Sequence, residues 1–459
     1  MAPPLRSIGK LCAYTALVLI ISGLFLNYGI DTKLIRGHFQ KDKLVDQSSS
    51  PAPEKLDSLH SKPPGNTLQG SGNKVGKTDW TVAAGNYADD YSLNSQRCAA
   101  TFPDLFKEIK RASAYWKQLK ISISDLDNSW ASEGVVRALI FDGRLYILET
   151  KFSGAGYNIH RSLAILSSIH RAIGSSTDPI PNVEFSFSVS DIADSEHKGS
   201  GRPIWTFSRR AEDEHQWLMP DFGFWSWGLD LVGEYTQIRN QISQSENTFS
   251  DKLSKAVWRG TENSQVRKDL IKVTKPFRQT WADIQSITWS GRIKLSSNSK
   301  LKALSIPEHC NWKFLIHTEG VSYSGRGKYL LNCHSVFVAH ELEWIENWHQ
   351  FLVSDGPNQN YVRVKRDFSD LPDKMRFLLD HPVLAERIAN NSVTTFRDGY
   401  LTPAAQACYW REMLRAWRDV SFEPELWEEV EALNEAGQST DPQWRMRGIP
   451  YETFVYVQS

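Results

Sequence analysis

Apolar and polar positions alternate with two different periods along the chain, and the changes of period separate strands from helices. Residues 135–149 contain two alternating runs around an Asp-Gly pair, which predicts a β-hairpin. Residues 160–174 repeat apolar positions at helical spacing, and Gly174 is suited to end that helix. Residues 182–190 alternate again, which predicts a strand that ends at Asp191.

The second half of the chain continues this alternation of strands and helices. A strand is predicted over residues 255–260 and a helix over residues 264–273. Three more helices are predicted later, over residues 368–381, 382–399 and 404–420. Such alternation is typical of an α/β protein with parallel sheets. The chain has 459 residues, and the part after residue 95 is long enough for two domains of this kind.

Residues 308–338 give the clearest unit, which reads as strand, Gly/Ser turn, helix and strand. The turn covers residues 318–327, and residues 327–333 open the helix. A turn at the carboxyl end of a strand points backbone N–H groups outward, and the helix that follows adds its positive end. With Arg326 and Lys328 beside it, this turn is predicted to bind an anion.

Asp191, Arg259 and the loop Ser322–Arg326 each follow a predicted strand. Because open α/β sheets bind ligands outside the carboxyl ends of their strands, we expect these groups to converge on one cleft. Plainer interpretations stay open for each. Asp191 is also suited to cap a turn, Arg259 to join a surface ion pair, and the loop to be an ordinary turn.

The amino-terminal part predicts a membrane anchor and a stem. Residues 11–30 are apolar and carry no charge, which is long enough for one helix across a bilayer. We expect a retained signal anchor with residues 1–10 in the cytoplasm, and a cleaved signal peptide is the alternative. Residues 31–95 are rich in Ser, Pro, Gly and Lys, so we expect a flexible stem. The final residues are not a KDEL-type signal, which favours the Golgi over the ER.

Charge and cysteine content narrow the class of protein. Lys+Arg and Asp+Glu both number 53, so no basic excess points to nucleic acid. Four cysteines follow the predicted anchor, which allows three disulfide pairings in an oxidising compartment. In one of these pairings, Cys310–Cys333 closes the 308–338 unit and Cys98–Cys408 ties the start of the globular part to its end.

Three other patterns have competing interpretations. Asp125 and Asp127 form a DxD pair, which binds a divalent cation in some transferases but is equally suited to start a helix. The histidines of the second half lack metal-ligand spacing and are expected to be structural, namely His309, His317, His334, His340 and His349. The aromatic cluster is expected to be mainly core, with one or two members lining a cleft, and comprises Trp217, Phe222, Phe224, Trp225 and Trp227.

Residues 181–425 resemble glycosyltransferase family 90, the capsule-associated, Rumi-like family that includes animal protein O-glucosyltransferases and fungal xylosyltransferases. The likeness is carried by ordered blocks: FSFSVSD at 185–191, PIWTF at 203–207, WLMPDFGFWSW at 217–227, VWRGTENSQVRKDL at 257–270 and the stretch from His309 to Val338. The tail CYWREML at 408–414 is similar as well. In this family a disulfide stands at the positions of Cys310 and Cys333.

The resemblance implies a GT-B fold, in which two Rossmann-like domains face each other across a cleft. We assign residues 96–250 to an acceptor-side domain, 251–400 to a nucleotide-sugar domain and 401–459 to helices packing back on the first domain. The resemblance further implies inversion at the sugar carbon, no metal and no other cofactor, with Asp191 as the base. The implied donor-binding residues are Arg259, Gly260, Val321, Ser322, Ser324, Gly325 and Arg326.

The sequence thus predicts a lumenal, type II membrane-anchored glycosyltransferase of the Golgi or ER. Its donor is expected to be UDP-xylose or UDP-glucose, and its acceptor a hydroxyl of a glycan or glycoprotein. The segments with which the animal enzymes recognise an EGF module are not matched. A lumenal carbohydrate-binding protein without catalysis, and a metal-dependent transferase using Asp125 and Asp127, are the alternatives.

Overall fold

A computed structural model describes residues 87–131, 133–152, 156–192, 201–229, 231–287, 303–430 and 443–458. The predicted membrane span at 11–30 and the predicted stem up to residue 86 lie outside these residues. Within the described ranges, no helix is both long enough and apolar enough to cross a bilayer.

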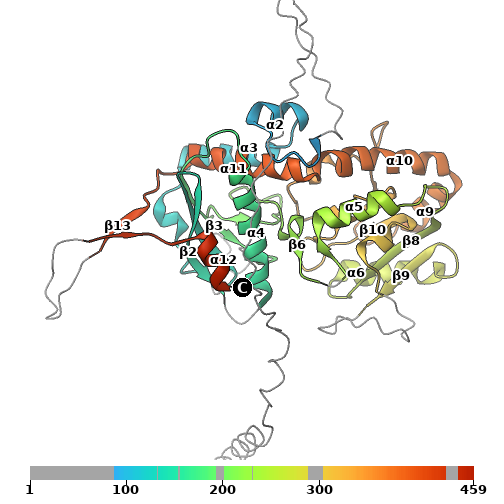
Figure 1. Ribbon diagram of the computed structural model, residues 1–459. Helices are drawn as coiled ribbons and strands as arrows, with labels where there is room; N and C mark the ends of the chain where they lie inside the picture. Colours follow the sequence, from blue (N-terminus) through green and yellow to red (C-terminus); the bar gives the residue numbers. More distant parts are fainter. Residues whose placement is uncertain are drawn as a thin grey trace, which may run out of the picture. The chain divides into compact units, whose positions relative to one another are not determined.

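The first of two large sheets has six strands (Figure 1). In spatial order they are β15 (Ile449–Pro450), β2 (Arg144–Lys151), β1 (Val135–Phe141), β3 (Val183–Ser188), β4 (Trp205–Thr206) and β5 (Trp217–Leu218). The predicted hairpin is confirmed, because β1 and β2 pair around Asp142 and Gly143, whose φ angles are 48° and 70°. Positive φ at both central residues is the geometry of a tight hairpin turn.

The prediction of parallel sheets is wrong for most of this first sheet. β1 pairs antiparallel with both β2 and β3, and only β3, β4 and β5 run parallel. A short hairpin can join only antiparallel neighbours, so its presence already fixes the direction of two strands. β4 and β5 have two residues each, too short for a sequence pattern to reveal.

The second sheet has five strands, all parallel, as the alternation of strands and helices predicts. Its order is β12 (Val362–Val364), β11 (Val336–His340), β10 (Trp312–His317), β8 (Leu253–Gly260) and β9 (Ala282–Ser286). The chain moves from β8 to β9 on one side and then returns to place β10 on the other. The strand order therefore reverses between β8 and β10, which is where open α/β sheets bind ligands.

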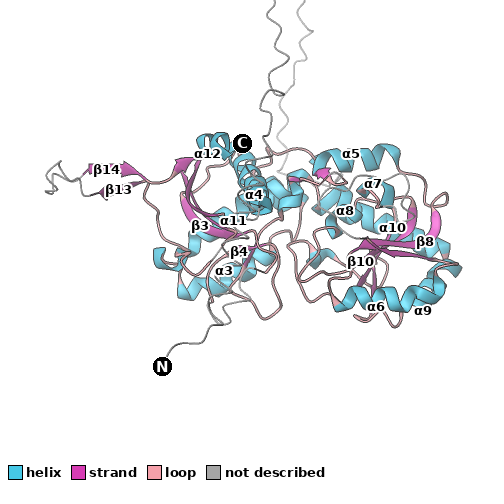
Figure 2. Cartoon of the chain, turned by 90° about the horizontal axis from the view of Figure 1, so that it is seen from below, coloured by secondary structure: helices cyan, strands magenta, loops and turns pink. Residues whose placement is uncertain are grey.

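Helices cover both sheets (Figure 2). On the first sheet, α4 and α12 pack on β2, α3 packs on β5, and α11 packs on β3 as well as on α2, α3 and α4. On the second sheet, α6 packs on β9 and α10 on β11. Their bounds are α2 (Ser95–Thr101), α3 (Lys107–Leu119), α4 (Gly156–Gly174), α5 (Tyr235–Ser245), α6 (Gln265–Thr274), α7 (Ile306–His309), α8 (Gly327–Leu330), α9 (Leu371–Asp380), α10 (Pro382–Thr395), α11 (Pro403–Val420) and α12 (Tyr451–Gln458).

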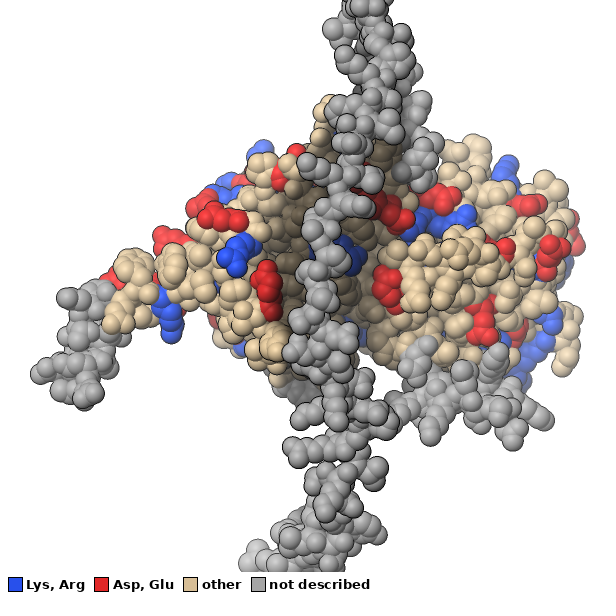
Figure 3. Space-filling view, viewed as in Figure 1, with Lys and Arg blue, Asp and Glu red and all other residues tan. Residues whose placement is uncertain are grey.

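Further short elements connect these layers. The strands β6 (Ser226–Trp227) and β7 (Gly233–Glu234) pair with each other, as do β13 (Trp427–Val430) and β14 (Gln443–Met446). A 3₁₀ turn, Phe222–Phe224, follows β5, and a π-helical turn, Phe396–Tyr400, joins α10 to α11. On the face shown in Figure 3, Lys/Arg and Asp/Glu side chains are interspersed.

Alternate residues of the second sheet enter two different apolar cores. Phe314 and Ile316 of β10 pack with the core around α6, α9 and α10. Leu315 of the same strand and Phe337 of β11 belong instead to the core that also contains the first sheet. Since neighbouring side chains of a strand point to opposite faces, the second sheet separates these two cores.

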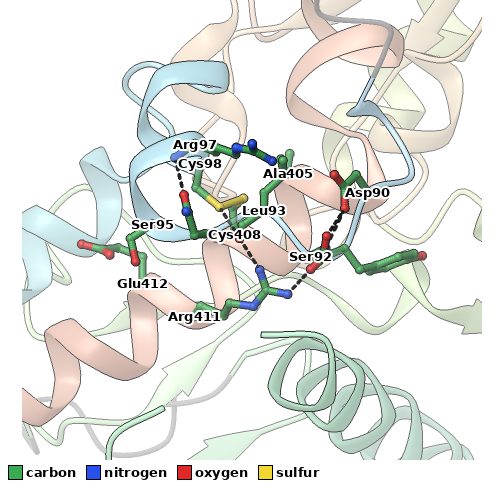
Figure 4. The surroundings of a disulfide bond; sticks show 12 residues. Asp90, Ser92, Leu93, Ser95, Arg97, Cys98, Ala405, Cys408, Arg411 and Glu412 are labelled. Carbon is green, nitrogen blue, oxygen red and sulfur yellow. Dashed lines mark hydrogen bonds between the residues drawn. A yellow bond between two sulfur atoms is a disulfide. The ribbon is translucent and has the colours of Figure 1, made fainter. Parts of the chain in front are cut away.

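Two disulfides, Cys98–Cys408 and Cys310–Cys333, confirm the pairing favoured by the sequence. The first joins α2 to α11 across a sequence separation of 310 residues. Arg411 lies one helical turn beyond Cys408 and donates to the carbonyl oxygens of Leu93 and Tyr91 beside the disulfide (Figure 4). The amino-terminal segment of the described chain is therefore fixed to the last long helix by a covalent bond and by hydrogen bonds.

Candidate active site

A cavity of about 390 Å³ lies at the point where the strand order of the second sheet reverses. Its walls include Arg259 and Gly260 at the end of β8, and Ser324 and Arg326 in the loop after β10. One wall is apolar and comes from the segment around β6 and β7 and from residues near α7, namely Trp227, Leu229, Leu231, Val232, Leu304 and Ile306. The cavity thus combines cationic groups with an apolar surface.

Arg259 and Arg326 meet in this cavity, as the sequence predicts for the ends of neighbouring strands. The Arg326 Nη1 donates to the main-chain carbonyl of Arg259. Arg259 donates from Nη2 to the Asp283 carboxylate at 2.9 Å and from Nη1 to the Asp283 carbonyl at 2.7 Å. Its Nε is buried and has no partner among the described residues. Asp283 therefore holds the Arg259 side chain and leaves one of its donors free.

Arg267 is a third guanidinium in the cavity wall that the sequence analysis missed. It is buried in the first turns of α6 and donates to the Glu319 carbonyl at 3.0 Å and to Asn263 Oδ1 at 2.9 Å. Burial lowers the pKa of Arg267 to about 10. The only signal in the sequence was its position shortly after the Trp-Arg-Gly block, at the start of the helix that follows β8.

The charge of these arginines is incompletely neutralised within the protein. Burial, and then repulsion from Arg267, lower the pKa of Arg326 to about 9. Across the described ranges, neither Arg326 nor Arg267 makes an ion pair with a carboxylate, and both donate to neutral oxygens. A buried cation without a counter-charge is costly, so this cavity is suited to a ligand that brings negative charge.

His309 also lines the cavity and was predicted to be structural. Its Nδ1 lies 2.8 Å from the Ser305 carbonyl oxygen, and its buried Nε2 has no partner among the described residues. Burial, reinforced by the nearby Arg326, lowers the pKa of His309 to about 4, so the imidazole is neutral at physiological pH. A neutral ring that donates from Nδ1 leaves Nε2 as an acceptor.

Two glycines permit the close packing of this site. A Cβ on Gly260 would lie 2.5 Å from the Trp258 ring, and a Cβ on Gly325 would lie 2.8 Å from the Asp221 carboxylate. Both distances are shorter than a real Cβ contact tolerates, which explains glycine at these positions. Any larger residue at Gly325 would displace the loop that carries Arg326.

The predicted anion seat needs two corrections. The helix after the loop, α8, has only four residues, so it adds little of the positive end expected of a longer helix. Lys328 does not face an anion site, because its Nζ lies 2.6 Å from Asp221 Oδ1 and is fully buried. Lys328 Nζ also donates to the Gly325 carbonyl at 2.7 Å. The lysine thus fixes the loop from behind, and the arginines remain the cations of the cavity.

Asp191 lies three residues beyond the carboxyl end of β3, which is an inner strand of the first sheet. Its carboxylate is 55% exposed and pairs with Arg161 Nη1 through Oδ1 at 2.8 Å. Its main-chain carbonyl accepts a hydrogen bond from Ser322 Oγ at 2.7 Å. Ser322 lies in the same loop as Arg326, so the structure brings Asp191 next to the cationic loop. Asp191 is not among the described residues that line the cavity itself.

The remaining predicted positions divide between the cavity and the surface. Ser324 lines the cavity, whereas Val321 is 63% exposed beside Ser322. Of the aromatic cluster, Trp217 and Phe222 are core residues and Trp227 lines the cavity. This agrees with the expectation that one or two members of the cluster reach the cleft.

Asp125 and Asp127 are engaged in local turns. Asp125 accepts from the backbone N–H and hydroxyl of Ser122, which completes a capping box at the 3₁₀ turn Ile123–Leu126. Asp127 accepts from Ser129, and these hydrogen bonds lower the pKa of its carboxyl. The expectation of a helix start therefore holds for Ser122 and Asp125, which cap the beginning of the 3₁₀ turn, whereas Asp127 lies at its carboxyl end.

Among the described residues, one group of potential metal-ligating side chains lies within mutual reach, and it consists of Glu246, Cys310 and Cys333 without any histidine. The two cysteines are joined in a disulfide and offer no thiolates to a metal. His340 accepts from the Glu319 N–H, and His349 contacts Glu346, which are structural roles.

The fold and the cavity define an α/β protein with a cavity at the reversal point of a parallel sheet and buried arginines in the cavity wall. Residues 96–448 match the family model described as glycosyl transferase family 90. The chain belongs to this family. The match covers the second sheet, the first sheet except β15, the cavity and Asp191.

Curated relatives are similar to parts of this chain at low sequence identity. Protein O-glucosyltransferase 1 of Rattus norvegicus is 26% identical over 223 residues, which are 46% of this chain and 56% of the relative. The O-glucosyltransferase rumi homolog of Aedes aegypti is 26% identical over 47% of this chain and 55% of its own length. O-glucosyltransferase rumi of Drosophila melanogaster is 23% identical over 73% of this chain and 91% of its own length. The chain thus spans little more than half the length of the first two relatives.

Proposed function

We propose that this chain is an inverting, metal-independent glycosyltransferase with a UDP-sugar as donor. The donor sugar is glucose or xylose, and the acceptor is a hydroxyl group of a glycan or a glycoprotein. Asp191 is the general base, and Arg259, Arg326 and the additional Arg267 bind the diphosphate. The names of the curated relatives, all O-glucosyltransferases, favour glucose on a protein-linked acceptor.

One observation carries the proposal. Buried guanidinium groups whose charge is incompletely neutralised lie in a cavity at the point where the strand order reverses, between β8 and β10. A diphosphate supplies the missing negative charge and matches the planar donor geometry of arginine. The apolar wall around Trp227 and Leu229 suits a nucleobase. The hydrogen bond from Ser322 Oγ to the main-chain carbonyl of Asp191 supports a role for this residue beside the donor loop.

In the proposed reaction, the acceptor oxygen forms a bond to the anomeric carbon while the bond from that carbon to the diphosphate oxygen breaks. Asp191 accepts the proton of the attacking hydroxyl. The electron pair of the broken bond goes to UDP, whose growing charge is stabilised by the arginine N–H groups. Attack from the side opposite the leaving group inverts the anomeric centre.

The two sheets support assignment to the GT-B architecture, in which the acceptor-side and nucleotide-side domains face each other. The proposed setting is the lumen of the Golgi or ER, with residues 11–30 as a type II anchor. The disulfides Cys98–Cys408 and Cys310–Cys333 support an oxidising compartment.

A donor panel tests the proposed function. The full-length chain, in detergent, should release UDP from UDP-glucose or UDP-xylose only when an acceptor is added, and an equal rate in EDTA is expected. Released UDP and the anomeric configuration of the product are the readouts. Retention of configuration, or a rate abolished by EDTA and restored by a divalent cation, would contradict the mechanism. Binding of UDP without any turnover would favour a carbohydrate-binding protein.

Arg326→Ala is expected to lower kcat about 10²- to 10³-fold, because it removes a charged donor from the developing diphosphate. Arg326→Lys should recover little of this loss, since an ammonium group cannot reproduce two parallel N–H donors. The kinetics are measured at saturating donor, together with UDP affinity by calorimetry. Arg363→Ala serves as the control, because Arg363 is an exposed cation on β12 of the same sheet. Similar losses in the two variants would show that general charge matters, and would contradict a specific role for Arg326.

A further inference from the structure

Asp191 is held through one oxygen of its carboxylate. Arg161, on α4, donates from Nη1 to Asp191 Oδ1 at 2.8 Å and also to the Val189 carbonyl at 2.9 Å. The same nitrogen therefore bridges the side chain of Asp191 and the main chain two residues before it. In the part of the chain that the structure describes, Oδ2 has no such partner, and the side chain is 55% exposed. Among the described residues, one oxygen of the carboxylate is therefore fixed and the other is without a partner.

Arg161 is itself held in place by aromatic rings. Its guanidinium carbon lies 4.7 Å from the centroid of the Phe222 ring and 5.0 Å from that of Tyr157. Phe222 belongs to the 3₁₀ turn after β5, and Tyr157 lies one turn earlier on α4. The Arg161 side chain is only 17% exposed. Cation–π contacts leave the N–H edge of the guanidinium free to make directed hydrogen bonds.

This arrangement is more specific than an ordinary surface ion pair. An exposed carboxylate beyond the end of a strand samples several rotamers, and an exposed pair adds only about 0–1 kcal/mol to stability. Here Phe222 and Tyr157 hold the Arg161 side chain through contacts that do not involve Asp191. Its contact therefore fixes the direction of the carboxylate at little further cost in entropy.

We infer that Arg161 is the positioning residue for the base, an inference that rests on the proposed function. By holding Oδ1, it directs Oδ2 of Asp191 toward the acceptor hydroxyl, and Oδ2 takes the proton. Arg161 does not touch the sugar or the diphosphate, and it acts only through Asp191. Ser322 fixes the main chain of the same residue from the donor side. The base is thus positioned by one contact from α4 and one from the donor loop.

The test compares Arg161→Met with Arg161→Lys in the full-length chain. Arg161→Met should lower kcat about 10- to 100-fold, because a misdirected base costs rate on this scale. The donor KM and the affinity for UDP should stay unchanged, and Arg161→Lys should recover part of the rate. Arg171→Met is the matched control. Arg171 is on the same helix, stacks on Trp225 at 4.0 Å and donates to the Tyr91 hydroxyl at 3.0 Å.

A double substitution separates positioning from a purely structural role. If Arg161 acts through Asp191, Arg161→Met should cause no further loss of the residual rate in the Asp191→Asn background. A full additional loss in that background, a kcat within twofold of the unsubstituted chain for Arg161→Met, or a parallel loss of UDP affinity would each overturn the inference. The proposed function is tested separately, on the unsubstituted chain. A lack of acceptor-dependent turnover in that chain would overturn the proposed function and, with it, the role of Arg161.

Discussion

Asp191→Asn is expected to lower kcat about 10²- to 10⁴-fold, the range contributed by a positioned general base. Asparagine has the same shape and still offers an oxygen to Arg161, but its side chain cannot accept a proton at neutral pH. Because Asp191 is not among the described residues lining the cavity, UDP affinity and donor KM should change little. Initial rates at saturating donor and acceptor, with calorimetry for UDP, measure the two effects separately.

Asp127→Asn provides a matched control for this experiment. Asp127 is an exposed aspartate that accepts hydrogen bonds from Ser129, and it is one of the two aspartates of the metal-dependent alternative. Its substitution should leave kcat unchanged. An inactive Asp127→Asn variant together with full turnover in Asp191→Asn would contradict the assignment of Asp191 as the base. The metal-dependent alternative would then be the better explanation.

Lys328→Met is expected to reduce the free energy of unfolding by about 3–5 kcal/mol, because it leaves the buried Asp221 carboxylate without its partner. The ammonium and carboxylate groups lie 2.6 Å apart with side-chain exposures of 0% and 2%. Asp221 Oδ1 would keep the hydrogen bond from the Gly223 N–H at 2.6 Å, but among the described residues Oδ2 has no hydrogen bond and Lys328 is the cation paired with this carboxylate. Denaturant unfolding followed by tryptophan fluorescence measures the effect.

A second substitution tests whether this loss comes from the unpaired charge. Asp221→Leu combined with Lys328→Met should be more stable than Lys328→Met alone, because the buried charge is then removed from both sides. Lys107→Met is the matched control, since Lys107 pairs with Asp104 on the surface at 3.4 Å and should unfold at the same midpoint as the parent chain. Equal midpoints for Lys328→Met and Lys107→Met would contradict the argument.

Sequence patterns predicted the parts of the site that depend on local chemistry. The Asp-Gly turn defined the β1–β2 hairpin, and the Gly/Ser loop after β10 identified Arg326. The cysteine pairs were among few possibilities and are confirmed. The turn and the loop are each encoded in a short stretch of chain, and the cysteine pairs could be named because four cysteines allow only three pairings.

The rest depends on contacts between residues far apart in the sequence. Lys328 follows Arg326 by two residues, and nothing local shows that Asp221 turns it away from the anion site. Arg267 and Arg161 each lie on an amphipathic helix where an arginine is expected on the solvent side. Only the packing of α6 near the β10 loop and of α4 near the end of β3 gives these two arginines their partners.

The last long helix of the chain, α11, packs on the first sheet, and this affects the order in which the protein can fold during synthesis. Trp417 of α11 contacts Trp205 of β4 and Trp217 of β5, which are fully buried aromatic residues of that sheet. During translation these rings are exposed until α11 has left the ribosome. The Cys310–Cys333 bond can close earlier, whereas Cys98 must wait as a free thiol for Cys408. The part of the protein that is synthesised first therefore depends on residues synthesised near the end for its packing and for its disulfide.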